Sequence, residues 1–230
     1  MRKYIVGNWK CHKSYDEARR WFDEFAAGYS PVEGVEIIIA PSFICLENLS
    51  RYLKDLKLEN VSLAAQDISP FPMGGYTGAI AADMVKDFVD YVIVGHSDRR
   101  RYFHETSQDV ANKVGEAVDA GIQPIVCVDQ PYAMSQLMAL ADIDVEHLII
   151  GYGPVEALNF RIPESPEKVA ESVTFIQNIH PDKIVIYGGS LHPDNVTPYL
   201  ELENLSGLFV GASSLIAADF LKICNKAMVS

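Results

Sequence analysis

The sequence is poor in positive charge. It holds 19 lysine and arginine residues against 31 aspartate and glutamate residues, which gives a net charge of −12. Such a surface repels nucleic acid and anionic membranes, so we expect neither as a partner. An anionic ligand would therefore have to be captured by local positive groups.

Long apolar runs and paired cysteines are also missing. No run approaches the roughly 18 apolar residues of a membrane span, and the N-terminal MRKYIVGNWK lacks the features of a signal peptide. No cysteine lies in a CxxC motif or at metal-ligand spacing from a histidine, so we expect no metal centre. Reduced thiols in a cytoplasmic protein are the simplest interpretation of the four cysteines, which are Cys11, Cys45, Cys127 and Cys224.

The 230 residues, of which 49% are hydrophobic, suit one large domain over residues 1–230 without a linker. Short apolar runs rich in valine and isoleucine alternate with helical patterns. Continuous runs of this kind are typical of parallel strands buried on both faces. The pattern predicts an α/β fold, a (β/α)₈ TIM barrel, with an open doubly wound sheet as the alternative. The runs are Tyr4–Trp9, Val35–Pro41, Val61–Gln66, Tyr91–Gly95, Ile122–Val128, His147–Tyr152, Lys183–Tyr187 and Gly207–Gly211.

Two helices have clear signals. Apolar residues from Tyr15 to Phe25 fall on one helical face. Ser165-Pro166-Glu167 reads as an N-cap, a proline at the first helical position and an acidic first turn. The short connection from Gln130 to the sixth strand predicts a brief helix there.

In a barrel of this type the site is built at the C-terminal ends of the strands. Lys10 follows the first strand, where its ammonium could attract an anion, although a plain surface lysine is the alternative. His96 directly follows the fourth strand and precedes a helix, whose N-terminal dipole disfavours the imidazolium. A neutral ring there could donate a hydrogen bond to a carbonyl oxygen. A purely structural role is the alternative, and it is our interpretation of His12, His104, His147, His180 and His192.

Two glycine-rich turns follow the last two strands. They read Tyr187-Gly188-Gly189-Ser190 and Val210-Gly211-Ala212-Ser213-Ser214. Turns of this kind bring several backbone N–H groups to one point, and loops seven and eight are the usual phosphate site of such barrels. We therefore predict a phosphate-binding site here.

The loop Pro70–Gly78 is long and has apolar residues at its tip. Exposed Phe71, Met73 and Tyr76 would suit a protein interface, whereas a loop packed on its own barrel is the alternative.

These motifs together resemble the triosephosphate isomerase family, in the family's order along essentially the whole chain. The matching segments are Gly7-Asn8-Trp9-Lys10, Gly74-Gly75-Tyr76-Thr77-Gly78, Gly95-His96-Ser97-Asp98-Arg99-Arg100, Pro124-Ile125-Val126-Cys127-Val128 and Tyr187-Gly188-Gly189-Ser190.

The resemblance implies an enzyme that interconverts dihydroxyacetone phosphate and glyceraldehyde 3-phosphate through an enediolate, in the cytoplasm, in glycolysis and gluconeogenesis, without a cofactor or metal. In that family a glutamate is the base, a neutral histidine and a lysine are electrophiles, and a lid after strand six closes over the phosphate. By position, His96 and Lys10 are the electrophiles and Asn8 orients the substrate. The phosphate would be held by Gly189, Ser190, Gly211 and Ala212, and Tyr76 and Thr77 would reach into a homodimer partner.

The sixth strand departs from the family at the position of the base. The family has its glutamate immediately before Pro-Val or Pro-Pro, and this chain has Gly153, which has no side chain to accept a proton. Glu156 is the nearest carboxylate that could replace it, up to about 10 Å farther along an extended chain. A positioned general base contributes roughly 10²–10⁴ in rate. We therefore expect the isomerase activity to be weak.

The lid and its surroundings depart too. Asn159-Phe160-Arg161 stands where the family has Gly-Thr-Gly, and Ala212 replaces a glycine of the phosphate turn. Gln130 replaces a glutamate, and Asp98 is one methylene shorter than the usual residue. Three functions remain open: a weak isomerase, a catalytically silent paralogue that binds a phosphorylated ligand, and an isomerase-like barrel with a changed substrate.

Overall fold

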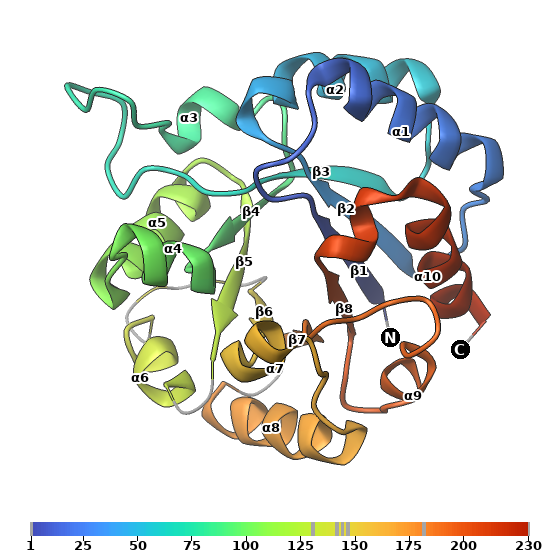
Figure 1. Cartoon of the computed structure of the whole chain (residues 1–230). Helices are drawn as coiled ribbons and strands as arrows, with labels where there is room; N and C mark the ends of the chain where they lie inside the picture. Colours follow the sequence, from blue (N-terminus) through green and yellow to red (C-terminus); the bar gives the residue numbers. More distant parts are fainter. Residues whose placement is uncertain are drawn as a thin grey trace.

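A computed structural model describes residues 2–129, 132–140, 143, 145, 148–180 and 183–229. Its parallel strands form a closed barrel in the order β1 to β8, and the helices surround it (Figure 1). The strands are β1 Lys3–Asn8, β2 Val35–Ala40, β3 Val61–Ala65, β4 Tyr91–Val94, β5 Gln123–Val128, β6 Ile149–Tyr152, β7 Ile184–Tyr187 and β8 Gly207–Val210.

Closure of the barrel depends on the pairing of the first strand with the last. Tyr4 of β1 lies opposite Gly207 of β8. A Cβ on Gly207 would lie 1.9 Å from the Tyr4 carbonyl oxygen, and its φ is 149°. Glycine is therefore required at this junction, and the (β/α)₈ barrel is confirmed against the open-sheet alternative.

Apolar side chains form two layers, one inside the barrel and one between the barrel and the helices. Alternate residues of β5 illustrate the division. Ile125 and Cys127 join the inner cluster, whereas Val126 and Val128 join the outer one. This alternation explains why the strands read as continuous apolar runs, because both of their faces are covered.

The helices have the bounds α1 Tyr15–Gly28, α2 Phe43–Leu56, α3 Ala82–Val85, α4 Ser97–Phe103, α5 Ser107–Asp119, α6 Ala133–Met138, α7 Val155–Phe160, α8 Pro166–Ile179, α9 Thr197–Leu200 and α10 Ala217–Val229, with a 3₁₀ turn η1 at Ala212–Leu215. The predicted apolar face of α1 is buried except for the half-buried Tyr15. It also contains Trp21, whose ring centroid lies 5.0 Å from that of Trp9. Ser165 caps α8 as predicted, and α6 is brief.

The predicted strand ends were wrong by one residue at several positions. Trp9, Gln66, Gly95 and Gly211 lie just beyond β1, β3, β4 and β8. The reason is visible at Gly95, whose φ of 68° already turns the chain out of the strand. His147 and Gln130 lie outside the described residues.

The loop between β3 and α3 projects from the barrel, at the upper left of Figure 1. Phe71, Met73 and Tyr76 are exposed on it, and Thr77 is exposed as well. The Phe71 and Tyr76 rings stack with centroids 4.7 Å apart. The loop is therefore not packed on its own barrel.

Within the described part of the chain, no helix is long and apolar enough to cross a membrane.

Candidate active site

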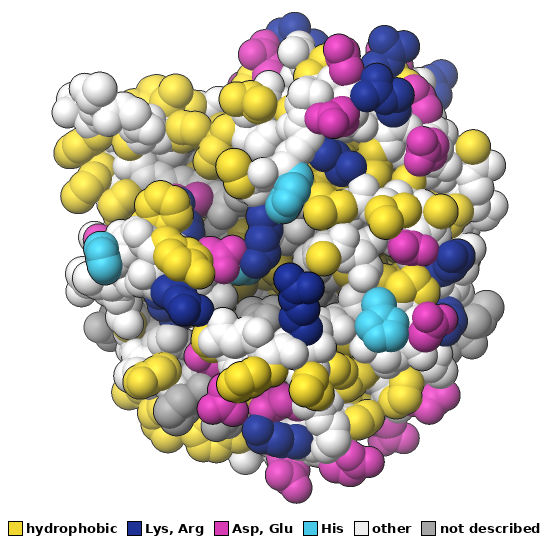
Figure 2. Space-filling view, viewed as in Figure 1, with side chains coloured by type: hydrophobic (Ala, Val, Ile, Leu, Met, Phe, Trp, Pro, Cys, Tyr) yellow, Lys and Arg dark blue, Asp and Glu magenta, His cyan; other side chains and the backbone are white. Residues whose placement is uncertain are grey.

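The strand ends bring the predicted residues to one rim of the barrel. Asn8 is the last residue of β1, and its side-chain oxygen accepts the Lys10 backbone N–H at 2.9 Å. This bond closes a turn in which Lys10 has a φ of 52°. In the space-filling view, Lys and Arg side chains gather near the centre of the face that overlies the barrel (Figure 2). A local positive region is thus present on an acidic protein.

Lys10 forms an ion pair with Asp98. Its Nζ lies 2.8 Å from Oδ2 of Asp98, in the first turn of α4. The shorter aspartate therefore still reaches the lysine. Both side chains are about 40% exposed (39% for Lys10, 41% for Asp98), so the pair contributes little to stability and mainly sets the position of the ammonium.

His96 is the N-cap of α4, and its ring is buried. Its Nδ1 accepts the Asp98 backbone N–H at 3.1 Å. Burial lowers the pKa of His96 from 6.5 to about 4, Lys10 and Arg100 lower it further, and Asp98 opposes them. The neutral form that the sequence predicted is thus supported, but burial is the main cause. Since Nδ1 accepts, the proton is on Nε2, which can donate to a ligand.

Gly153 directly follows β6, beside the end of β5. Its N–H donates to the Val128 carbonyl at 3.0 Å. A Cβ built on Gly153 would meet only the Gly188 carbonyl oxygen, at 3.4 Å. A Cβ therefore fits at this position. Glu156 lies in the first turn of α7 and is exposed.

The two glycine-rich turns lie on the same rim. A Cβ on Gly189 would lie 2.2 Å from the Tyr187 hydroxyl, so this turn requires glycine. Ser190 has a φ of 53°, and its hydroxyl donates to the Ala157 carbonyl of α7 at 2.9 Å. After β8, Gly211 precedes the exposed Ala212, which starts η1.

The family model described as triosephosphate isomerase matches residues 3–227. The chain belongs to the triosephosphate isomerase family. It is 33% identical to the triosephosphate isomerase of Thermodesulfovibrio yellowstonii, in an alignment that covers 96% of this chain and 98% of that relative. It is 34% identical to that of Mycoplasmopsis pulmonis, with 95% of each chain covered. The crystal structure of triosephosphate isomerase from Bartonella henselae superposes with a TM-score of 0.85 at 30% identity, over 98% of this chain and 99% of that one.

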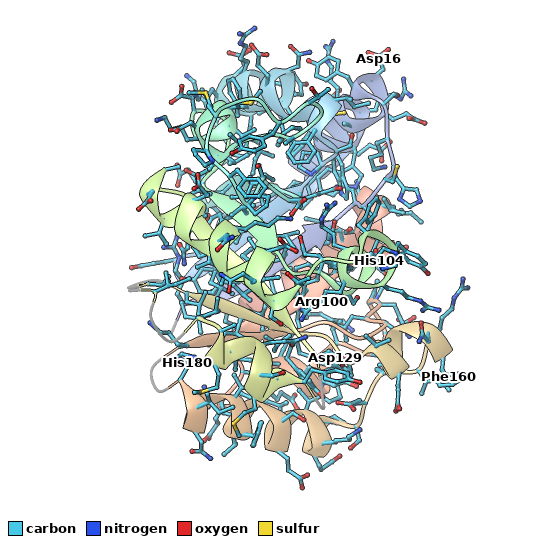
Figure 3. The ribbon with its side chains drawn as sticks, turned by 90° about the vertical axis from the view of Figure 1, so that its left-hand side faces the viewer. Asp16, Arg100, His104, Asp129, Phe160 and His180 are labelled. Atoms are coloured by element: carbon cyan, nitrogen blue, oxygen red, sulfur yellow. The ribbon has the colours of Figure 1, made fainter. Side chains whose placement is uncertain are left out.

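Three residues near this triosephosphate isomerase-type rim were not singled out from the sequence. The Arg100 guanidinium donates to the carbonyls of Gly95 and Cys127, which ties the ends of β4 and β5 together. Asp129 follows β5 and accepts the Val155 N–H at 3.1 Å. Figure 3 shows Arg100 and Asp129 near one another and Phe160 at the outer edge of the lid helix. Arg101 of α4 donates to the Asn159 side chain at 3.0 Å.

The environment of Asp129 differs from that of His96. Burial raises the pKa of Asp129, while the Val155 N–H and Arg100 oppose this; the nearby Glu164 and Glu156 raise it. Val155, Glu156 and Glu164 belong to the lid, whereas Arg100 of α4 also acts on the pKa of His96. Asp129 therefore connects the end of β5 to the start of the lid. Its position directly after a buried strand, like that of His96, is the sequence signal that could have revealed it.

Proposed function

We propose that this protein binds a triose phosphate at the barrel mouth and slowly interconverts dihydroxyacetone phosphate and glyceraldehyde 3-phosphate through an enediolate. The observation that carries the proposal is the buried, neutral His96 beside the Lys10–Asp98 pair, in a barrel that has Gly153 and no carboxylate at the end of β6. The electrophilic half of the family's site is present, and the basic half is missing.

These roles are the ones that the family resemblance implies for His96, Lys10 and Asn8. Nε2 of His96 donates to the substrate carbonyl, and the Lys10 ammonium stabilises the negative charge that develops on the enediolate oxygens. Asn8 orients the substrate through its side chain. At Gly153 no carboxylate receives the proton that leaves carbon, so water or the exposed Glu156 has to receive it, with a loss of roughly 10²–10⁴ in rate.

A catalytically silent paralogue that binds a phosphorylated ligand is the second candidate. Gly153 favours it, and so does the lid tip, where Asn159 is tied to Arg101 and Phe160 is 73% exposed. An isomerase-like barrel with a changed substrate rests on the same lid residues. In each case Ser190, Gly189, Gly211 and Ala212 form the proposed phosphate site.

The proposal includes a homodimer formed through the projecting loop, with Tyr76 and Thr77 reaching the partner. The proposal includes neither a cofactor nor a metal, and it places the protein in the cytoplasm. The exposed apolar tip of the loop supports the first of these points.

An isomerase assay with dihydroxyacetone phosphate in D₂O, followed by NMR to very low rates, tests the proposal. We expect slow exchange of the carbon-bound proton and slow formation of the aldose, both reduced in His96→Ala. Binding of dihydroxyacetone phosphate without turnover or exchange would favour the silent paralogue. Neither binding nor turnover would refute both.

A further inference from the structure

The lid, defined here as residues 154–164, is tied to the rest of the barrel at its N-terminal end by three side chains from three other segments. Asp129 accepts the Val155 N–H at 3.1 Å. The Ser190 hydroxyl donates to the Ala157 carbonyl at 2.9 Å. Arg101 donates to the Asn159 side chain at 3.0 Å. The helix α7 is therefore docked on the rim.

The C-terminal end of the lid is fixed by Glu164, whose side chain is only 10% exposed. Its Oε2 accepts the Tyr152 hydroxyl at 2.7 Å, and its other carboxylate oxygen pairs with Lys168. Its backbone N–H donates to the Tyr187 hydroxyl at 3.0 Å, and its carbonyl accepts the Tyr199 hydroxyl at 2.5 Å. The side chain and both backbone groups of one residue are thus engaged by β6, β7, α8 and α9.

The contact between the lid and Ser190 bears on ligand binding. A serine hydroxyl has a single proton to donate. While the hydroxyl donates this proton to the Ala157 carbonyl, it cannot also donate it to a phosphate oxygen. A phosphate that takes a hydrogen bond from the Ser190 hydroxyl, in addition to the backbone N–H groups of the turn, must therefore displace the lid carbonyl from it.

We propose that Glu164 is a positioning residue of the lid, and that the lid it holds in place competes with a phosphate for the hydroxyl proton of Ser190. The competition rests on the proposed function in one respect, which is that the phosphate binds at the Ser190 turn. The holding of the lid does not depend on it.

Hydrogen exchange tests the first half without any ligand. In Glu164→Ala we expect the amides of residues 155–161 to exchange at least about fivefold faster, since one net hydrogen bond of about 1 kcal/mol is lost from local opening. Exchange in α5 should be unchanged. Glu164→Gln keeps an acceptor for Tyr152 and should restore most of the protection. Glu171→Ala, an exposed glutamate of α8, is the matched control.

Unchanged lid exchange in Glu164→Ala would overturn the positioning role. An equal rise in α5 would also overturn it, because the effect would then be global unfolding.

Titration with inorganic phosphate tests the second half. We expect Glu164→Ala to bind phosphate about fivefold more tightly than the wild type, as the same net hydrogen bond is weakened, and we expect this gain to vanish in the Ser190→Ala background. An unchanged affinity, or a gain that persists without the serine hydroxyl, would overturn the competition. If Ser190→Ala alone leaves phosphate binding unchanged, the proposed phosphate site fails with the competition, whereas hydrogen exchange still decides the role of Glu164.

Discussion

Restoring a carboxylate at position 153 is the most direct test of what the barrel mouth can do. A Cβ there would meet only the Gly188 carbonyl oxygen, at 3.4 Å, so that little has to move. Pro154 restricts the preceding residue to extended backbone, which an L-residue adopts without strain. We therefore expect Gly153→Glu to fold as the wild type does.

The expected gain in kcat/KM for glyceraldehyde 3-phosphate is at least about tenfold, the low side of what a general base supplies. The upper limit of about 10⁴ corresponds to roughly 5.5 kcal/mol of barrier. Recovery should fall short of that limit for two reasons. The lid tip Asn159-Phe160-Arg161 departs from the family, and a misplacement of about 1 Å can cost on the order of 10²-fold.

Gly153→Gln is the matched control, because it fills the same space and cannot act as a base. His96→Ala should remove most of the gain in the glutamate background. If the glutamine variant equals the glutamate variant, the gain comes from packing and the reasoning is refuted. A wild type that is already as active as Gly153→Glu would show that another group takes the proton, and Glu156→Gln would then be the variant to assay.

The remaining predictions concern stability, ligand and assembly. The pKa of His96 is lowered from 6.5 to about 4 in the folded state, so the free energy of unfolding should fall by about 2 kcal/mol between pH 7 and pH 5, as the ring of the unfolded chain becomes protonated. Chemical unfolding at the two pH values should show a smaller fall in His96→Gln, and equal falls would contradict the assignment. Ser190→Ala should weaken phosphate binding severalfold, since it removes one hydrogen bond to a charged group; an unchanged affinity in a calorimetric titration would contradict the placement. Light scattering at micromolar concentration should give the mass of a dimer, and Thr77→Arg should shift it toward the monomer, whereas a monomeric wild type would contradict the interface.

The barrel could be predicted from the sequence because a closed parallel sheet leaves a direct record in it. Strands covered on both faces read as continuous apolar runs, as in β4, where every residue is buried. The junction of β1 and β8 left no comparable signal. Gly207 is required there only because the Tyr4 backbone of another strand approaches it. The open sheet could therefore be excluded only by the structure.

The site was predictable only in part, for a related reason. His96 and Lys10 lie close behind the ends of β4 and β1, so that the strand pattern alone placed them on one rim. The contacts of Glu164 depend on hydroxyls of Tyr152, Tyr187 and Tyr199. Those residues are up to 35 positions away in sequence, and no local pattern indicates that they converge. The helix dipole alone predicts that the pKa of His96 is lowered. Burial, which is the larger cause, is a property of the packed barrel and cannot be predicted from the local sequence.

The family's residues that this chain keeps at the barrel mouth support more of the local structure than a side chain at position 153 would. Asn8 closes the turn at Lys10, Lys10 pairs with Asp98, and the Asp98 backbone caps onto His96. A change at any of these positions disturbs the rim itself. A Cβ at position 153 would meet only the Gly188 carbonyl oxygen, so a glycine there leaves the nearby packing as it is. The motifs around Lys10 and His96 would therefore persist in a barrel that had lost its activity as well as in one that had kept it. The rate gained in Gly153→Glu distinguishes an intact electrophilic site from one that has only kept its shape.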